Sequence, residues 1–211
     1  MKSRALLIAI IVALGALLVW LAFFWQPVAP GPATKNLPHS QLQLAQAPQG
    51  GDFTLQGFNG PVALKDFRGK VVLIYFGYTF CPDVCPTSLS LMAQALSSLE
   101  TAERERVQGI FVSVDPDRDT PEHLNVYAPY FHPGIIGITG STEQLTAVAS
   151  QYGASYTKQK PNADGLYAVD HSSITYVIDP NGKLAASLPH ASTPQQIVAA
   201  VRPLLAAGTS K

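Results

Sequence analysis

The chain has 211 residues, and its 14 lysines and arginines balance 14 aspartates and glutamates, giving a formal net charge of zero. This length allows one well-buried α/β domain plus an additional segment. The balanced charge, and the lack of a basic cluster after the first residues, argue against a nucleic-acid-binding protein.

An uncharged apolar stretch occupies residues 5–25, directly after Lys2 and Arg4. As a helix it would be about 31 Å long, which matches the hydrocarbon core of a bilayer. A cleavable signal peptide has an apolar region of only about 7 to 15 residues, so residues 1–25 are predicted to be a retained transmembrane anchor. The positive-inside rule keeps Lys2 and Arg4 cytoplasmic. We therefore expect a single-pass protein of the inner membrane with its C-terminal domain in the periplasm.

The next segment, residues 26–51, contains five prolines and a single charged side chain, Lys35. Such a composition without a sustained hydrophobic period is typical of a semi-extended linker. We leave His39 in this linker without a role. The remaining residues, 52–208, are expected to form the folded domain.

The first part of this domain combines a hairpin, a strand and a helix. Residues 53–55 and 62–64 are separated by an Asn-Gly pair, which predicts a short hairpin. Residues 71–76 form a continuous apolar run, typical of a strand buried on both faces of a largely parallel sheet. Gly77 ends the run, and residues 87–99 then show helical spacing of apolar side chains.

The two cysteines of the chain, Cys81 and Cys85, lie between this strand and this helix, each followed by proline. Residues four apart at a helix start have Cα atoms about 6 Å apart, so the sulfurs can form a disulfide or share one metal ion. A purely structural disulfide remains an alternative. The free N–H groups of a helix start favour negative charge, so at least one thiol is expected to ionise more easily than a free cysteine.

The rest of the chain alternates strands and helices, the pattern of βαβ units. Strands are predicted at 109–114 and 135–138, helices at 120–130 and 141–152, short flanks of a polar insert (159–165) at 155–158 and 166–169, an antiparallel pair at 174–178 and 184–188, and a last helix at 193–205. This order predicts an α/β, thioredoxin-like domain with an N-terminal hairpin and insertions, preceded by a single transmembrane helix.

The loop at residues 115–122 carries three aspartates at alternate positions, as a calcium loop would. The match fails because Thr120 and Val126 stand where the turn glycine and the bidentate glutamate are required. We interpret the loop as a helix entry beside the site.

His171 precedes the antiparallel strand, where the loop of a thioredoxin-like domain lies against the cysteine loop. Two thiolates and one imidazole suit Cu(I) and can also hold Cu(II). Zinc could use the same atoms, but a structural zinc site needs four ligands and no third cysteine exists. Three other histidines have no such placement and stay unassigned: His123, His132 and His190.

Several motifs resemble the Sco/SenC family: Cys-Pro-Asp-Val-Cys-Pro at 81–86, Ser-Val-Asp-Pro-Asp-Arg-Asp-Thr-Pro-Glu at 113–122, Val-Asp-His-Ser at 169–172 and Ile-Gly-Ile-Thr-Gly at 136–140. The resemblance covers residues 52–205 and includes the single N-terminal anchor. It implies a thioredoxin-fold copper chaperone that delivers copper to the binuclear site in subunit II of cytochrome c oxidase. By position, the family's ligands correspond to Cys81, Cys85 and His171.

The main rival is a thiol-disulfide oxidoreductase, in which Cys81 and Cys85 would be the redox-active pair. Thioredoxin-type reductases use C-x-x-C and carry a cis-proline where this chain has Asp170, His171 and Ser172, which favours metal binding. A peroxiredoxin-type peroxidase is disfavoured because Pro82 stands three residues before Cys85, where that family has threonine. A simple interaction module would need no cysteine pair beside a histidine. The sequence does not identify the copper donor, the thiol reductant or the particular oxidase.

Overall fold

The computed structural model describes residues 47–207, together with 14–15, 17 and 20. The chain divides into two compact units, Met1–Gln41 and Leu42–Lys211. Most of the predicted anchor at residues 1–25, and the linker as far as residue 46, lie outside the described residues. Within the described part of the chain, no helix is both long and apolar enough to cross a membrane.

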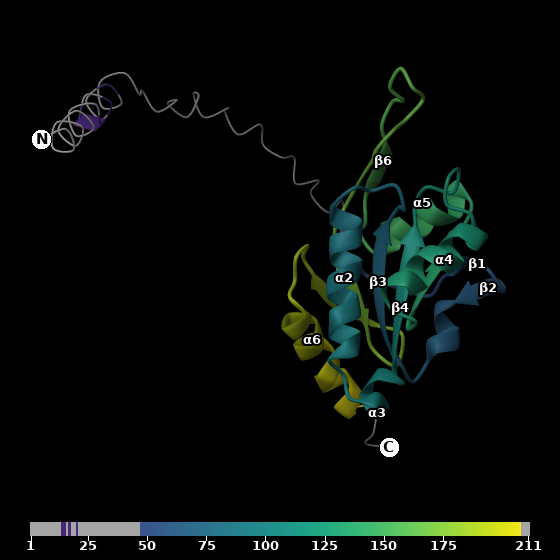
Figure 1. The fold of residues 1–211 in the computed structure, drawn as a ribbon. Helices are drawn as coiled ribbons and strands as arrows, with labels where there is room; N and C mark the ends of the chain where they lie inside the picture. Colours follow the sequence, from purple (N-terminus) through teal and green to yellow (C-terminus); the bar gives the residue numbers. More distant parts are fainter. Residues whose placement is uncertain (1–13, 16, 18–19, 21–46, 208–211) are drawn as a thin grey trace, which may run out of the picture. The chain divides into compact units, whose positions relative to one another are not determined.

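The second unit contains the predicted alternation of strands and helices (Figure 1). The strands are β1 (Thr54–Gly57), β2 (Gly60–Ala63), β3 (Val71–Gly77), β4 (Val107–Ser113), β5 (Ile135–Ile138), β6 (Tyr156–Lys158), β7 (Val169–His171), β8 (Thr175–Ile178) and β9 (Leu184–Leu188). The helices are the 3-10 turn η1 (Leu64–Phe67), α2 (Val84–Ser97), α3 (Thr101–Arg104), α4 (Pro121–Phe131), α5 (Thr142–Gln151) and α6 (Pro194–Ala207).

Five strands form the central sheet in the order β5-β4-β3-β8-β9. The first three are parallel, whereas β8 and β9 are antiparallel to their neighbours. All seven residues of β3 are buried, as the continuous apolar run predicted for the middle strand of a covered sheet. The two-stranded hairpin β1-β2 also forms as predicted, with Gly57 opposite Gly60.

Helices cover both faces of the sheet. In Figure 1, α2 runs alongside β3, and α2 packs against both α6 and α4. Successive side chains of a strand point to opposite faces. Accordingly Tyr75 points toward the start of α2, where its hydroxyl lies 3.4 Å from the Val84 carbonyl oxygen, while Phe76 packs against Tyr152 after α5. The end of β3 therefore meets the first turn of α2 on one face.

Helix α2 begins three residues earlier than the predicted range of 87–99, at Val84. The prediction was wrong because Pro86 was taken to precede the helix. The first N–H groups of a helix have no intrahelical acceptor, so a proline in the first turn loses no hydrogen bond. Cys85 consequently lies inside the first helical turn, and Cys81 lies in the loop before it.

A separate two-stranded ribbon, β6-β7, replaces the predicted loop around His171. His171 is the last residue of β7 and pairs with Tyr156 of β6. The polar insert forms the connection between the two strands, as predicted. Short helix α3 was not predicted from the sequence.

Candidate metal centre

The structure brings all three predicted site residues together. Cys81 comes from the loop after β3, Cys85 from the first turn of α2, and His171 from the end of β7. Their ligand atoms, two sulfurs and one imidazole nitrogen, all lie within 4.8 Å of one another. Segments far apart in the sequence thus converge at one end of the central strand.

Cys85 is the most deeply placed of the three and is fully buried. Its Sγ lies 3.1 Å from His171 Nε2. A Cβ atom at position 77 would lie only 2.7 Å from this sulfur, so the glycine at the end of β3 makes room for the thiol. Gly77 is therefore a site residue that the sequence marked only as the end of a strand.

Burial, rather than the helix start, sets the proton affinity of Cys85. Desolvation raises the pKa of this thiol well above its usual range, and the neighbouring Cys81 adds to the effect. For Cys85 the result is the opposite of the easier ionisation expected at a helix start. A cation that replaces the thiol proton would remove this desolvation cost, because it stabilises the thiolate directly.

His171 turns the lone pair of its Nε2 toward the sulfur of Cys85. Its Nδ1 lies 3.2 Å from the Ser172 carbonyl oxygen, so this nitrogen donates and the proton is held on the side away from Cys85. Burial lowers the pKa of the imidazole, which favours its neutral form. The rings of Tyr75 and Tyr78 lie edge-on to it, with centroids 6.1 and 5.8 Å away. The imidazole is therefore oriented as a metal ligand requires.

A surface pocket of about 340 Å³ gives access to this group, and Cys81 and His171 both line it. Asp83 and Asp170 also line the pocket, and the Asp170 carboxylate accepts a hydrogen bond from the Gln159 amide. Two of the three ligand side chains therefore border a pocket at the surface, whereas Cys85 is not among its lining residues.

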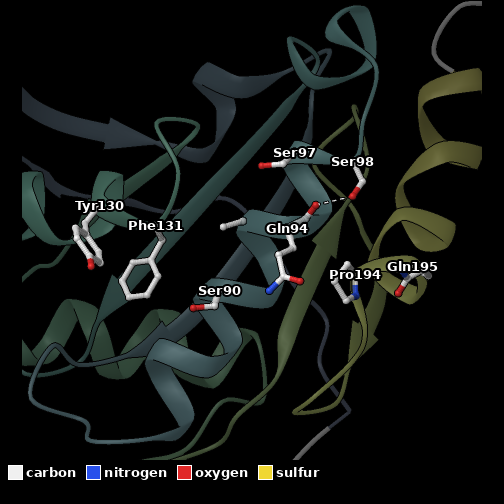
Figure 2. A pocket seen from close by; sticks show the side chains of 9 residues that line it. Ser90, Gln94, Ser97, Ser98, Tyr130, Phe131, Pro194 and Gln195 are labelled. Carbon is white, nitrogen blue, oxygen red and sulfur yellow. Dashed lines mark hydrogen bonds between the residues drawn. The ribbon is translucent and has the colours of Figure 1, made fainter.

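A second pocket, of about 640 Å³, lies away from the cysteines (Figure 2). Uncharged side chains line it, with Tyr130 and Phe131 of α4 facing Ser90 and Gln94 of α2. It contains no cysteine, histidine or carboxylate, so it offers no soft metal ligand.

The unassigned histidines take no part in the group. His132 Nδ1 accepts the Gly134 N–H at 2.9 Å, and His190 Nδ1 lies 3.2 Å from the Ser88 hydroxyl. His123 packs edge-on against Phe80. His39 lies outside the described residues.

The acidic loop at residues 115–122 leads into α4, as its interpretation as a helix entry predicted. Thr120 caps α4 by accepting the His123 N–H at 3.3 Å. Asp119 is fully buried and accepts hydrogen bonds from the Thr79 N–H at 2.9 Å and the Thr79 hydroxyl at 2.5 Å. Its carboxylate thus anchors the cysteine loop two residues before Cys81.

Two thiols and a neutral imidazole at the edge of a thioredoxin-like sheet define a class of protein whose site binds a soft metal ion or exchanges disulfides. The SCO1/SenC family model matches residues 42–206. A bovine protein, "Protein SCO2 homolog, mitochondrial", is 41% identical over 167 residues, which are 78% of this chain and 63% of the bovine protein. The chain belongs to the SCO1/SenC family.

Solved structures of relatives have a similar fold. Arabidopsis thaliana ScoI with copper bound matches with a TM-score of 0.69 at 33% identity, over 75% of this chain and 98% of that chain. BsSco, described with a disulfide switch and as a member of the Sco family of cytochrome c oxidase assembly proteins, matches with a TM-score of 0.60 at 28% identity, over 78% and 96%. These matches confirm the mixed α/β, thioredoxin-like fold. The chain spans about half to two thirds of the length of its bovine and yeast relatives.

Proposed function

We propose that this protein is a membrane-anchored copper chaperone. It binds one copper ion through Cys81, Cys85 and His171 and delivers it to the binuclear copper site of cytochrome c oxidase subunit II. The observation that carries the proposal is the convergence of the three ligand atoms within 4.8 Å of one another. Copper-bound relatives and the oxidase-assembly description of BsSco support it.

The donor set fits copper better than other common metals. Soft thiolates favour Cu(I), and one imidazole adds a ligand that Cu(II) also accepts. Zinc in structural sites takes four protein ligands, and among the described residues only three converge here. A low-coordinate ion at a pocket open to the surface can exchange ligands with an approaching target, which is what delivery requires.

Ion binding at this site is coupled to proton release. The His171 imidazole is already favoured in its neutral form, whereas the buried Cys85 thiol must lose a proton to become a ligand. Copper affinity should therefore rise with pH across the neutral range.

The decisive experiment measures copper in the oxidase itself. In a strain that lacks this protein, subunit II should accumulate without its copper, and the parent gene should restore the copper content. A Cys81→Ser gene should fail to restore it, whereas Glu103→Gln, in an exposed ion pair of α3, should restore it fully. Full copper loading in the strain without the protein would contradict the delivery function.

The rival proposal is that the protein reduces the cysteines of subunit II or of another extracytoplasmic target. The disulfide switch in the description of BsSco supports this reductase function as the alternative. It predicts that subunit II in the deficient strain carries oxidised cysteines, and that a strong thiol reductant without added copper restores the oxidase. Copper delivery predicts the reverse, rescue by copper and not by the reductant.

The membrane anchor is the third part of the proposal, based on the apolar residues 5–25 after two basic residues. After washing with alkaline carbonate, the protein should remain in the membrane fraction. Protease added to spheroplasts should digest the domain, while a cytoplasmic marker protein stays intact. Recovery of the full-length protein in the soluble cytosol would contradict both the topology and the delivery role.

A further inference from the structure

The ribbon that carries His171 is not part of the central sheet. Strands β6 and β7 pair with each other and form a separate two-stranded sheet. No strand ladder of the central sheet includes His171, and three residues connect it to β8, which pairs with β3. Side-chain contacts therefore add to this chain connection in holding the ribbon against the cysteine loop.

Arg118 lies between these two parts of the site. Its guanidinium carbon is 3.6 Å from the ring centroid of Tyr167, which precedes β7, and 4.7 Å from that of Phe80, next to Cys81. A flat guanidinium stacks on aromatic faces in a way that a lysine ammonium does not. The side chain thus joins the ribbon to the cysteine loop.

Hydrogen bonds also hold Arg118 in place against Asp115 and Tyr167. Arg118 Nε donates to a carboxylate oxygen of buried Asp115 at 2.5 Å, and Nη1 donates to the Tyr167 carbonyl oxygen at 3.0 Å. The Tyr167 hydroxyl donates to the other Asp115 oxygen at 2.8 Å. Nη2 has no hydrogen-bond partner among the described residues, and the guanidinium carbon lies close to three aromatic rings, those of Tyr78, Phe80 and Tyr167. Arg118, Asp115 and Tyr167 form a closed network, which fixes each of them more firmly than one contact would.

One aromatic ring connects this network to the imidazole. The Tyr78 ring centroid lies 5.5 Å from the Arg118 guanidinium carbon and 5.8 Å from the His171 ring. On the other side, Asp119 holds the cysteine loop through Thr79. The loop that contains Arg118 and Asp119 therefore contacts both the segment that leads to His171 and the loop that contains Cys81.

We propose that Arg118 is a positioning residue that fixes the His171 ribbon on the cysteine loop and so sets how strongly the imidazole takes part in copper binding. The proposal deepens the copper function and rests on it. Two thiolates alone can hold Cu(I), whereas Cu(II) depends more on the nitrogen ligand. Loss of Arg118 should therefore weaken Cu(II) binding more than Cu(I) binding.

The test uses Arg118→Lys in the full-length protein, because lysine keeps the charge but loses the flat stack and the fork of donors. Loss of a residue that orients a metal ligand typically costs about 10–100-fold in affinity. We expect a Cu(II) loss in this range and a Cu(I) loss several-fold smaller. The thiolate-to-Cu(II) absorption and the electron paramagnetic resonance spectrum should shift toward those of His171→Ala. In the metal-free protein, amide hydrogen exchange at Val169, Asp170 and His171 should accelerate.

A double-mutant cycle separates positioning from general destabilisation. In a His171→Ala background, Arg118→Lys should cause almost no further loss of Cu(II) affinity. The matched control is Arg202→Lys, which should change none of these measurements. Arg202 lies on α6 and forms an exposed ion pair with Glu103 of α3. Should Arg118→Lys fail to fold, Tyr167→Leu removes the stacking ring and carries the same expectations.

An equal Cu(II) loss in both backgrounds, or equal losses for Cu(I) and Cu(II), would overturn the proposal. Unchanged hydrogen exchange at β7 would overturn it as well, and that measurement needs no copper. If the parent protein binds neither copper ion while the exchange still accelerates in the variant, the copper function is wrong and the positioning role stands.

Discussion

Cys85→Ser should lower the Cu(I) affinity of the full-length protein by more than about 100-fold. Loss of a residue that only hydrogen-bonds to a metal ligand already costs about 10–100-fold, and this substitution removes a ligand itself. The sulfur of Cys85 is fully buried beside His171, and a serine hydroxyl is a hard, protonated group that Cu(I) binds poorly. Cys81→Ser should behave similarly, since it also removes one of two thiolates. Competition with a chelator of known Cu(I) affinity measures both losses.

Two further variants make this experiment specific. His171→Ala leaves both thiolates, so it should weaken Cu(I) binding less than either serine variant and Cu(II) binding more strongly. Ser88→Ala removes a buried hydroxyl one turn further along α2 and should leave both affinities unchanged. If either cysteine variant keeps the parent's Cu(I) affinity, the ligand assignment is wrong. If His171→Ala binds both ions as the parent does, Asp170, which lines the same pocket, becomes the next candidate.

The central elements could be predicted from the sequence because their patterns are local. The apolar run of β3 and the residues of β5 were placed correctly, and Ser141, the first residue of the helix predicted at 141–152, is the N-cap of α5. The start of α2 was misplaced because proline in the first helical turn resembles proline before a helix. The strand β7 was read as a loop because its three residues are too few to show alternation.

The candidate site was predictable only in part. The proximity of His171 to the cysteines followed from the expected fold and not from spacing, since 86 residues separate it from Cys85. The expectation that at least one thiol ionises more easily named neither cysteine, and it did not foresee that burial of the first turn of α2, a tertiary effect, raises the pKa of Cys85. The contacts of Arg118 with Phe80 and Tyr167 join three distant segments, and no local pattern indicates them.

Oxidation of the cysteine pair should lower Cu(I) affinity further than any single substitution. Cys81 and Cys85 carry free thiols in the structure, and their sulfurs lie within 4.8 Å of each other, so a disulfide needs only a local adjustment. A disulfide contains no thiolate, and of the forms that a cysteine sulfur can take here only the thiolate is a good copper ligand. The metal-bound and disulfide forms therefore use the same two atoms and exclude each other.

The measurement is an anaerobic Cu(I) titration of reduced protein and of protein whose disulfide is verified by mass. We expect the oxidised form to bind more than about 100-fold more weakly, since it lacks both thiolates where a serine variant lacks one. The reduced Cys81→Ser protein is the matched control, because it cannot form the disulfide. Treatment with oxidant should leave its residual affinity unchanged.

Because copper and the disulfide use the same sulfur atoms, bound copper should also protect the two cysteines from chemical modification. Bound copper should slow alkylation of both cysteines, because the thiolates are then occupied by the metal. A domain outside the cytoplasm would meet oxidising conditions, so it would need a reductant before each loading with copper. Equal Cu(I) affinity of the oxidised and reduced forms would show that the cysteines are not the copper ligands. The thiol-disulfide oxidoreductase would then be the better description of this site.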